Sequence, residues 1–290
     1  MPPDAPNHAL VRAGNDVTPE AWMLFLHGIL GSGPNLRTIA RRFVQARPRW
    51  GAVLVDLRMH GSSQDFAPPH TVEAAARDLF ALDPRVPGPV RAVWGHSFGG
   101  KVALQYAYAA EGGHELEHLV IVDSNPGARP GGRGSESTLR VVDTLQELPP
   151  WFPTREAFVD ELQRRGYELP IAQWLAMNLE RGEHGVRFGL DVSAIHALLD
   201  DYFARDLWHV VEDPPGRCRV HVINGGRSNV YDAADRARVE ALAQRSDRVS
   251  LHVVAEAGHW VHADAPDALL DIMIAAVDPV TSGADRRPPC

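Results

Sequence analysis

The sequence has little cysteine, few aromatic residues and no long apolar run. Its 290 residues include two cysteines, Cys218 and Cys290, so a disulfide framework is not expected. The longest apolar run near the C-terminus, Leu269–Val277, is interrupted by Asp271 and is too short to span a bilayer. The first twenty residues contain no apolar stretch of the signal-peptide type. We therefore expect a cytoplasmic protein with no membrane span.

An excess of basic residues is also absent. Lys and Arg number 29 against 37 Asp and Glu, which gives a net charge of −8. Nucleic-acid binding needs a basic patch, so nucleic acids are not expected partners. No surface pattern points to a protein partner, and we expect a monomer or a small homo-oligomer. An apolar share of 44% with 23% charged residues is ordinary for a globular protein with a sizeable core.

Short apolar segments alternate with segments of helical periodicity. The predicted strands are Trp22–Leu26, Ala52–Val55, Val90–Trp94, Leu119–Val122, Arg219–Ile223 and Val249–Val254. The predicted helices between and after them are Leu36–Gln45, Val72–Leu82, Gly99–Ala109, Ala233–Gln244 and Pro266–Ala276. This alternation predicts an α/β fold with a mostly parallel central sheet and helices on both faces.

One interval, between Asp123 and Arg219, is too long for a simple crossover. Prolines divide it into predicted helices at Glu136–Leu148, Thr154–Arg165 and Ile171–Leu179. We therefore predict a core domain of residues 1–124 and 218–278 with an inserted helical cap of residues 125–217. Residues 279–290, rich in Pro and Arg, are expected to be a disordered tail.

The strongest motif is Gly95-His96-Ser97-Phe98-Gly99, which follows a predicted strand and precedes a predicted helix. G-x-S-x-G in this context is the nucleophile elbow of the α/β-hydrolase fold. The turn is so tight that only glycine fits on either side of the serine. Ser97 is the predicted nucleophile, and the N–H of Phe98 would face the developing oxyanion. The plain alternative is a structural turn.

A serine nucleophile needs a base, which in this fold follows the last strand. His259, in Ala257-Gly258-His259-Trp260, comes directly after Val249–Val254 and is the predicted base. Packing under Trp260 is the structural alternative. A metal site with His262 has no third ligand in view, so no metal is expected.

The acid is harder to place, because the loop Gly225–Asn229 carries no carboxylate where one is usual. Asp232 and Asp235 follow later, at the expected start of the next helix. We favour Asp123, at the end of the strand after the elbow helix, from which a carboxylate can also orient the histidine. Its alternative role is to anchor a turn.

The first strand runs into His27-Gly28-Ile29-Leu30. The N–H of Ile29, or that of Leu30, is expected to complete an oxyanion hole with Phe98. His27 is expected to be structural, as are Arg58 and His60 after the next strand, and the alternative role of these two is contact with substrate.

Several side chains are candidates for substrate contact on the core and on the apolar cap, although packing is the more common role for such cap residues. They are Leu30, His96, Trp260, Trp151 and Trp174.

A family resemblance rests on five segments. They are His27–Ser32, Asp56–Gly61, Gly95–Lys101, Gly225–Val230 and Gly258–Ala263. Over residues 22–277 the chain resembles the α/β-hydrolase subfamily that contains the bacterial esterase YbfF and the ABHD-eleven-like mitochondrial hydrolases. The resemblance implies carboxylesterase activity, with acyl-CoA thioesters as a further substrate class, no cofactor, and an acid at Asp123. The chain departs from the family pattern at Met59, usually asparagine, and at Ser124-Asn125-Pro126, usually an apolar pair before proline.

These observations predict a serine hydrolase that cleaves a small ester or thioester through an acyl-enzyme. A serine rather than an aspartate at the elbow argues against an epoxide hydrolase or a dehalogenase. A lactonase or a C–C bond hydrolase on the same scaffold stays open. A non-catalytic ligand receptor that retains the fold is the alternative from a different class.

Overall fold

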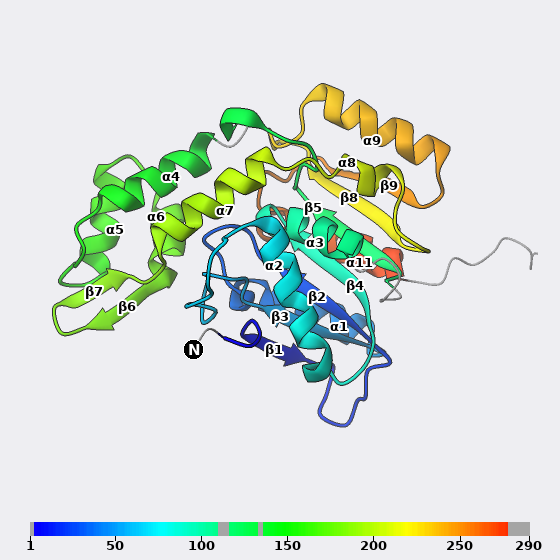
Figure 1. Ribbon diagram of the computed structural model, residues 1–290, viewed down its shortest axis with the longest axis horizontal. Coiled ribbons are helices and arrows are strands. Elements are labelled where there is room, and N and C mark those ends of the chain that lie inside the picture. Colours follow the sequence, from blue (N-terminus) through cyan, green and yellow to red (C-terminus); the bar gives the residue numbers. More distant parts are fainter. Residues whose placement is uncertain (1–2, 110–115, 133–135, 278–290) are drawn as a thin grey trace, which may run out of the picture.

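The computed structural model describes residues 3–109, 116–132 and 136–277, and within them a seven-stranded sheet forms the centre (Figure 1). Its order is β1-β3-β2-β4-β5-β8-β9, and β1 alone among these strands pairs antiparallel. The strands are β1 His8–Val11, β2 Ala21–Leu26, β3 Trp50–Val55, β4 Val90–His96, β5 His118–Val122, β8 Arg219–Gly225 and β9 Val249–Val254. The prediction of a mostly parallel sheet is confirmed.

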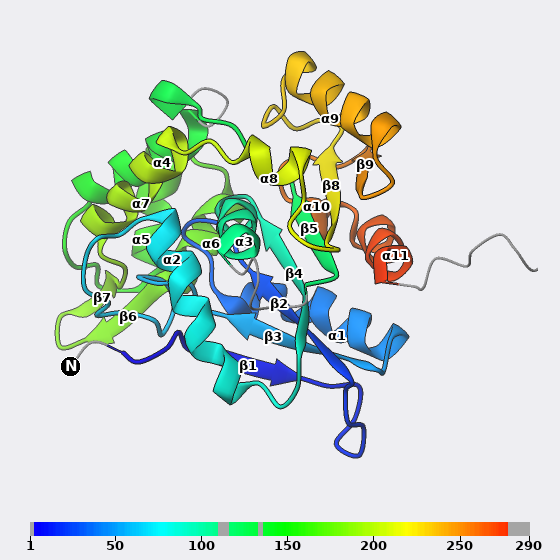
Figure 2. The ribbon, with the colours of Figure 1, turned by 45° about the vertical axis from the view of Figure 1, so that its right-hand side comes forward.

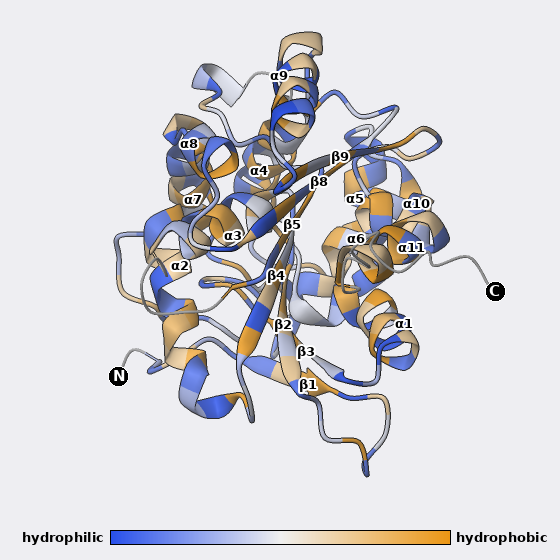
Figure 3. Ribbon diagram, turned by 90° about the vertical axis from the view of Figure 1, so that its right-hand side faces the viewer, coloured by the Kyte–Doolittle hydropathy of each residue, from blue (hydrophilic) through white to orange (hydrophobic). Residues whose placement is uncertain are grey.

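The central strands are apolar without alternation because helices cover both faces of the sheet. In β2, every residue from Trp22 to Leu26 is fully buried. Figure 3 shows α1, α10 and α11 on one side of the sheet and α2, α3, α8 and α9 on the other. These helices are α1 Arg37–Ala46, α2 Val72–Leu79, α3 Phe98–Ala109, α8 Trp208–Glu212, α9 Ala233–Arg245, α10 Val261–Asp264 and α11 Pro266–Val277. The predicted α/β-hydrolase fold is therefore confirmed.

Each face of the sheet carries its own apolar cluster. Phe43 of α1 and Met273 of α11 pack with Phe25 on one face. Val102 of α3 and Leu242 of α9 belong to the cluster on the other face. Because β4, β5, β8 and β9 run parallel, the loops at their carboxyl ends gather at one edge of the sheet, where α/β proteins place their sites.

The segment between β5 and β8 forms an arm of helices and one hairpin (Figures 1 and 2). Its elements before α8 are α4 Glu136–Glu147, α5 Arg155–Arg164, α6 Leu169–Leu175, β6 Leu179–Gly182, β7 Gly185–Phe188 and α7 Val192–Ala204, with short 3-10 turns at η3 Pro130–Gly132 and η4 Ala176–Asn178. Two further 3-10 turns lie in the core, η1 Gly33–Leu36 and η2 Phe80–Arg85.

The sequence pattern predicts helix through Leu179, but α6 ends at Leu175 and Leu179 begins β6. The hairpin turn needs Gly185, which has φ +115° and whose Cβ would lie 2.2 Å from a carbonyl oxygen of Phe152. The arm is therefore not purely helical. The division into a core of residues 1–124 and 218–278 and a cap of residues 125–217 stays a proposal, and we use the name cap for the latter range. The predicted tail, residues 279–290, lies outside the described residues.

Candidate active site

The turn between β4 and α3 presents Ser97 at the carboxyl edge of the sheet. Ser97 has φ +52°, and its N–H donates to the carbonyl of Val122 on the neighbouring strand at 3.0 Å. A Cβ on Gly95 would lie 2.2 Å from the carbonyl oxygen of Gly99, and one on Gly99 would lie 2.5 Å from that of His27. Glycine is therefore required on both sides of the serine, which explains the motif sterically.

His259 lies between Ser97 and Asp123. Its Nε2 is 3.1 Å from Ser97 Oγ, and its Nδ1 is 2.7 Å from Asp123 Oδ2. The histidine sits in the loop between β9 and α10, and its side chain is 34% exposed. Since Nδ1 donates to the carboxylate, Nε2 is left to accept the serine hydroxyl proton. The structure thus brings together the three side chains that the sequence singled out as nucleophile, base and acid.

Asp123 is fully buried at the end of β5 and adopts φ +45°. Its Oδ1 accepts hydrogen bonds from Asn224 Nδ2 at 2.7 Å and from the N–H of Gly225 at 3.0 Å. Its Oδ2 accepts from Ser228 Oγ at 2.6 Å as well as from His259. A buried carboxylate requires such donors. Ser228, in the loop that lacks a carboxylate, therefore serves the acid on the adjacent strand.

The two alternative acids face elsewhere. Asp232 caps the N-terminus of α9 by accepting from the N–H of Asp235 at 2.9 Å. Asp235 accepts from Asn125 Nδ2 at 2.7 Å and forms an ion pair with Arg129. Their contacts are those of a helix cap and of a link to the segment after β5.

Two buried histidines join the loops that follow β2 and β3. His27 Nε2 accepts from the N–H of Leu57 at 3.0 Å, and His60 Nε2 accepts from the N–H of Leu30 at the same distance. Burial lowers the pKa of His27 to about 4 and that of His60 to about 3, so both rings are neutral acceptors. The N–H of Leu30 is thereby engaged, which leaves Ile29 as the favoured donor of this loop.

His96, expected to contact substrate, makes its polar contact with the protein. Its Nε2 donates to the carbonyl of His259 at 2.8 Å, and its ring centroid lies 4.8 Å from those of His259 and His262. Burial, reinforced by the neighbouring rings of His259 and His262, holds the pKa of His96 well below its usual range. His96 therefore supports the backbone of His259.

The cap meets the site through α6 and η4. The ring centroid of Trp174 lies 5.7 Å from that of Trp260, the residue that follows His259. Asn178 Nδ2 donates to the carbonyl of Leu30 at 2.9 Å. Trp151 instead packs on the hairpin, where its ring centroid lies 5.7 Å from that of His184 and the guanidinium of Arg187 lies over its ring. The predicted cap tryptophans thus separate into one beside the site and one on the hairpin.

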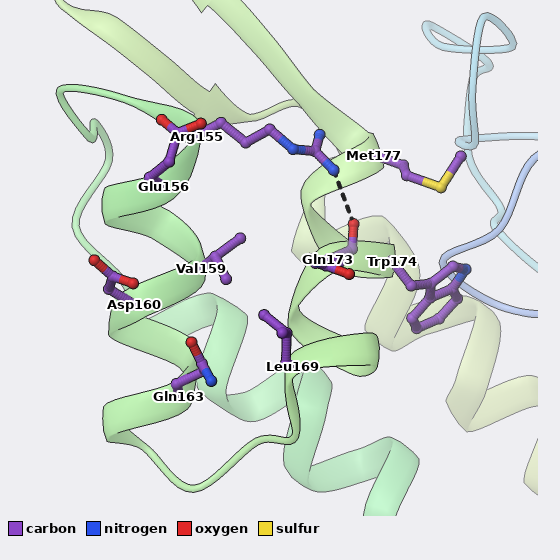
Figure 4. A pocket seen from close by; sticks show the side chains of 9 residues that line it. All are labelled: Arg155, Glu156, Val159, Asp160, Gln163, Leu169, Gln173, Trp174 and Met177. Atoms are coloured by element: carbon purple, nitrogen blue, oxygen red, sulfur yellow. Dashed lines mark hydrogen bonds between the residues drawn. The ribbon is translucent and has the colours of Figure 1, made fainter.

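A groove runs between α5 and α6 on the cap (Figure 4). Val159 and Leu169 lie between the two helices, and Trp174 and Met177 stand at one end. Leu169 and Met177 are 44% and 57% exposed. Charged and amide side chains make up the rest of the lining, so the groove is mixed in character and apolar mainly at the end next to the contact between Trp174 and Trp260.

Sequence reasoning missed Asn224, the partner role of Ser228, and Asn178. Asn224 directly follows the buried apolar pair Val222-Ile223 near the end of β8, and a polar residue at that position was the available signal. Nothing in the sequence around Asn178 indicates its contact with Leu30, 148 residues away. In the described part of the chain, no group of three or more His, Cys, Asp or Glu side chains is placed to hold a metal ion.

An elbow serine, a histidine after the last strand and a buried aspartate on a doubly wound sheet are the features of the serine hydrolase class. Comparison with known proteins identifies the family. The model described as Alpha/beta hydrolase family matches residues 23–272, and the chain belongs to that family.

Relatives and solved structures agree with this assignment. The chain is 30% identical over 250 residues to Esterase YbfF of Escherichia coli K12, covering 86% of this chain and 89% of that protein. It is 30% identical over 253 residues to the sn-1-specific diacylglycerol lipase ABHD11 of Mus musculus, covering 86% and 78%. A solved marine microorganism esterase superposes with a TM-score of 0.78 at 21% identity, covering 94% of this chain and 99% of that chain, which shows the shared fold. The resemblance seen in the sequence motifs is confirmed.

Proposed function

We propose that Ser97, His259 and Asp123 form a catalytic triad that hydrolyses carboxylic esters through an acyl-enzyme. The observation that carries this is the chain of hydrogen bonds from Ser97 Oγ through His259 to the buried carboxylate, at 3.1 and 2.7 Å. The protein is a carboxylic ester hydrolase, in line with its relatives named esterase and lipase.

The reaction begins when His259 Nε2 takes the proton of Ser97 and Oγ attacks the ester carbonyl. The N–H groups of Phe98 and Ile29 hold the oxyanion of the tetrahedral intermediate. The imidazolium then protonates the leaving alcohol as the carbon–oxygen bond breaks, leaving the acyl group on Ser97. Water, deprotonated by His259, releases the acid by the reverse steps.

The substrate class follows from the cap. Apolar Trp174, Trp260 and Met177 beside the site favour an ester with an apolar acyl chain. Several relatives are named sn-1-specific diacylglycerol lipase, so an acylglycerol is the natural ester that we propose to test first. Acyl-CoA thioesters are the second class.

The first test is intact-mass spectrometry after exposure to a fluorophosphonate, with the parent, Ser97→Ala and His259→Ala. Labelling of the parent alone supports the triad. A diacylglycerol then tests the acylglycerol class, a p-nitrophenyl ester series from acetate to octanoate measures the chain-length preference, and octanoyl-CoA tests thioesters. An unlabelled parent, under conditions in which a known serine hydrolase reacts, would overturn the proposal in favour of a ligand receptor.

None of the described helices is long and apolar enough to cross a membrane. The cytoplasmic location and the monomeric or small homo-oligomeric state stay proposals from the sequence. Cell fractionation and light scattering on a sizing column would test them.

A further inference from the structure

The oxyanion loop contains a residue in a conformation that its side chain disfavours. The N–H of Gly31 donates to the carbonyl of Gly28 at 3.0 Å and closes a four-residue turn. Leu30 is the third residue of this turn and has φ +62°, a position at which glycine or asparagine is preferred. The Leu30 side chain is buried in the core. The turn therefore needs support from outside itself.

That support comes from two side chains on other segments. His60 Nε2 accepts the N–H of Leu30 at 3.0 Å, and Asn178 Nδ2 donates to its carbonyl at 2.9 Å. The first contact comes from the core loop after β3 and the second from η4 of the cap. Both polar groups of the Leu30 backbone are thus held, one by the core and one by the cap.

Asn178 reaches the loop from a fixed point. Arg155, at the start of α5, donates to the carbonyls of Ala176 at 2.5 Å and of Gln173 at 3.0 Å. The carbonyl of Asn178 itself accepts the N–H of Gly189 at 2.9 Å. The short turn that carries the asparagine is therefore tied to α5 and to the end of the hairpin, so its amide has little freedom to move away from Leu30.

We propose that Asn178 is a positioning residue that holds the Leu30 peptide so that the N–H of Ile29 points at the oxyanion, which couples the cap to catalysis. This inference rests on the proposed function. Without the amide, the Leu30–Gly31 peptide loses its anchor while His60 still holds the N–H of Leu30. The turn that Gly28 and Gly31 close then relaxes from the positive φ of Leu30, and the Gly28–Ile29 peptide, which carries the Ile29 donor, is displaced. The oxyanion develops with every ester, so the loss must be independent of the acyl group.

The test compares Asn178→Leu with the parent on p-nitrophenyl acetate, butyrate and octanoate. Outright removal of one oxyanion donor costs about 10²–10³-fold in kcat, and we expect misalignment to cost about tenfold with KM changed less than twofold. The affinity for a trifluoromethyl ketone, which forms an oxyanion adduct with the serine, should fall by the same factor. Gln146→Leu, which also replaces an amide on the cap but lies on α4 outside the groove, is the matched control and should match the parent.

A second variant gives a readout that depends on the hydrogen bond itself. In Asn178→Asp an ionised carboxylate faces the Leu30 carbonyl and repels it, whereas a protonated carboxyl can donate to it. Because an aspartate ordinarily has a pKa near 4, the ratio of variant to parent activity should rise as the pH falls from 6 to 4.

Three results would overturn the role of Asn178 while leaving the triad intact. They are an unchanged kcat in Asn178→Leu, a loss that grows with acyl chain length, and an Asn178→Asp ratio that is flat with pH. The chain-length result would instead assign Asn178 to substrate contact. A parent that turns over no ester would refute the proposed function, and the role of Asn178 with it.

Discussion

Replacing Asp123 by asparagine keeps the shape of the acid and removes its charge. The amide oxygen must face the N–H donors of Asn224 and Gly225, since an NH₂ group on that side would meet two donors. The NH₂ group then faces His259 Nδ1, 2.7 Å away in the parent. His259 must present a lone pair at Nδ1, which moves its proton to Nε2, opposite Ser97. In this tautomer the histidine cannot accept the serine proton.

The size of the loss follows from these contacts. A charge-assisted hydrogen bond of the kind between Nδ1 and Oδ2 is worth about 1.5–3 kcal/mol. Restoring the productive tautomer against the amide costs a similar amount, so the barrier rises by about 3–6 kcal/mol, or about 10²–10⁴-fold in kcat/KM. The assay is kcat/KM on p-nitrophenyl butyrate together with the rate of fluorophosphonate labelling.

Asp232→Asn is the matched control, because asparagine caps a helix as well as aspartate does and the ester assay should be unaffected. Thermal unfolding of both variants checks that the fold is kept. If Asp123→Asn retained more than a tenth of the parent activity, or if Asp232→Asn carried the loss, the assignment of the acid would be refuted.

Three further changes test the surroundings of the site. Ser228→Ala removes the 2.6 Å hydrogen bond to Asp123 and should lower kcat/KM about tenfold in the same assay; unchanged activity would contradict a role for that bond. His27 and His60 are neutral in the fold, with pKa values of about 4 and 3, whereas the unfolded chain binds their protons near pH 6.5. Their contribution to the free energy of unfolding is therefore complete above pH 6.5 and falls by about 1.4 kcal/mol per pH unit per histidine on acidification toward pH 4. The Tm, measured from pH 7 to 4.5, should drop steeply. A Tm that does not change with pH argues against neutral rings. Gly95→Ala places a Cβ 2.2 Å from the carbonyl oxygen of Gly99 in the elbow. The free energy of unfolding, measured in urea, should fall by about 3 kcal/mol. A variant with the stability and activity of the parent would disprove the steric explanation.

The strands and helices that could be predicted are those with a strong apolar pattern. The runs Trp22–Leu26 and Val249–Val254 became β2 and β9 almost residue for residue. The hairpin could not be predicted, because β6 is Leu-Glu-Arg-Gly and three of its four residues are exposed. Such a strand forms because its partner is present, and pairing of this kind leaves no periodicity in a single segment.

The same distinction applies to the site. Ser97 and His259 could be predicted because each stands at a fixed position relative to a strand, within a motif that the backbone geometry requires. The contact from Asn178 to Leu30 could not, because it joins the cap to a core loop 148 residues earlier and depends on how the two pack. A local backbone geometry requires particular residues at fixed spacing and so produces a sequence motif, whereas a contact between distant segments produces none.

The histidines at the carboxyl edge show how one residue type is given different tasks by burial. Burial lowers the pKa of His27, His60, His96 and His262, and at least three of these rings hold backbone groups of the neighbouring loops. His259 differs because its side chain is 34% exposed and because a carboxylate faces its Nδ1. A neighbouring ring that took up a proton would repel the imidazolium that forms in the proposed acyl transfer. The surrounding neutral rings therefore hold the backbone of the neighbouring loops without placing positive charge beside His259.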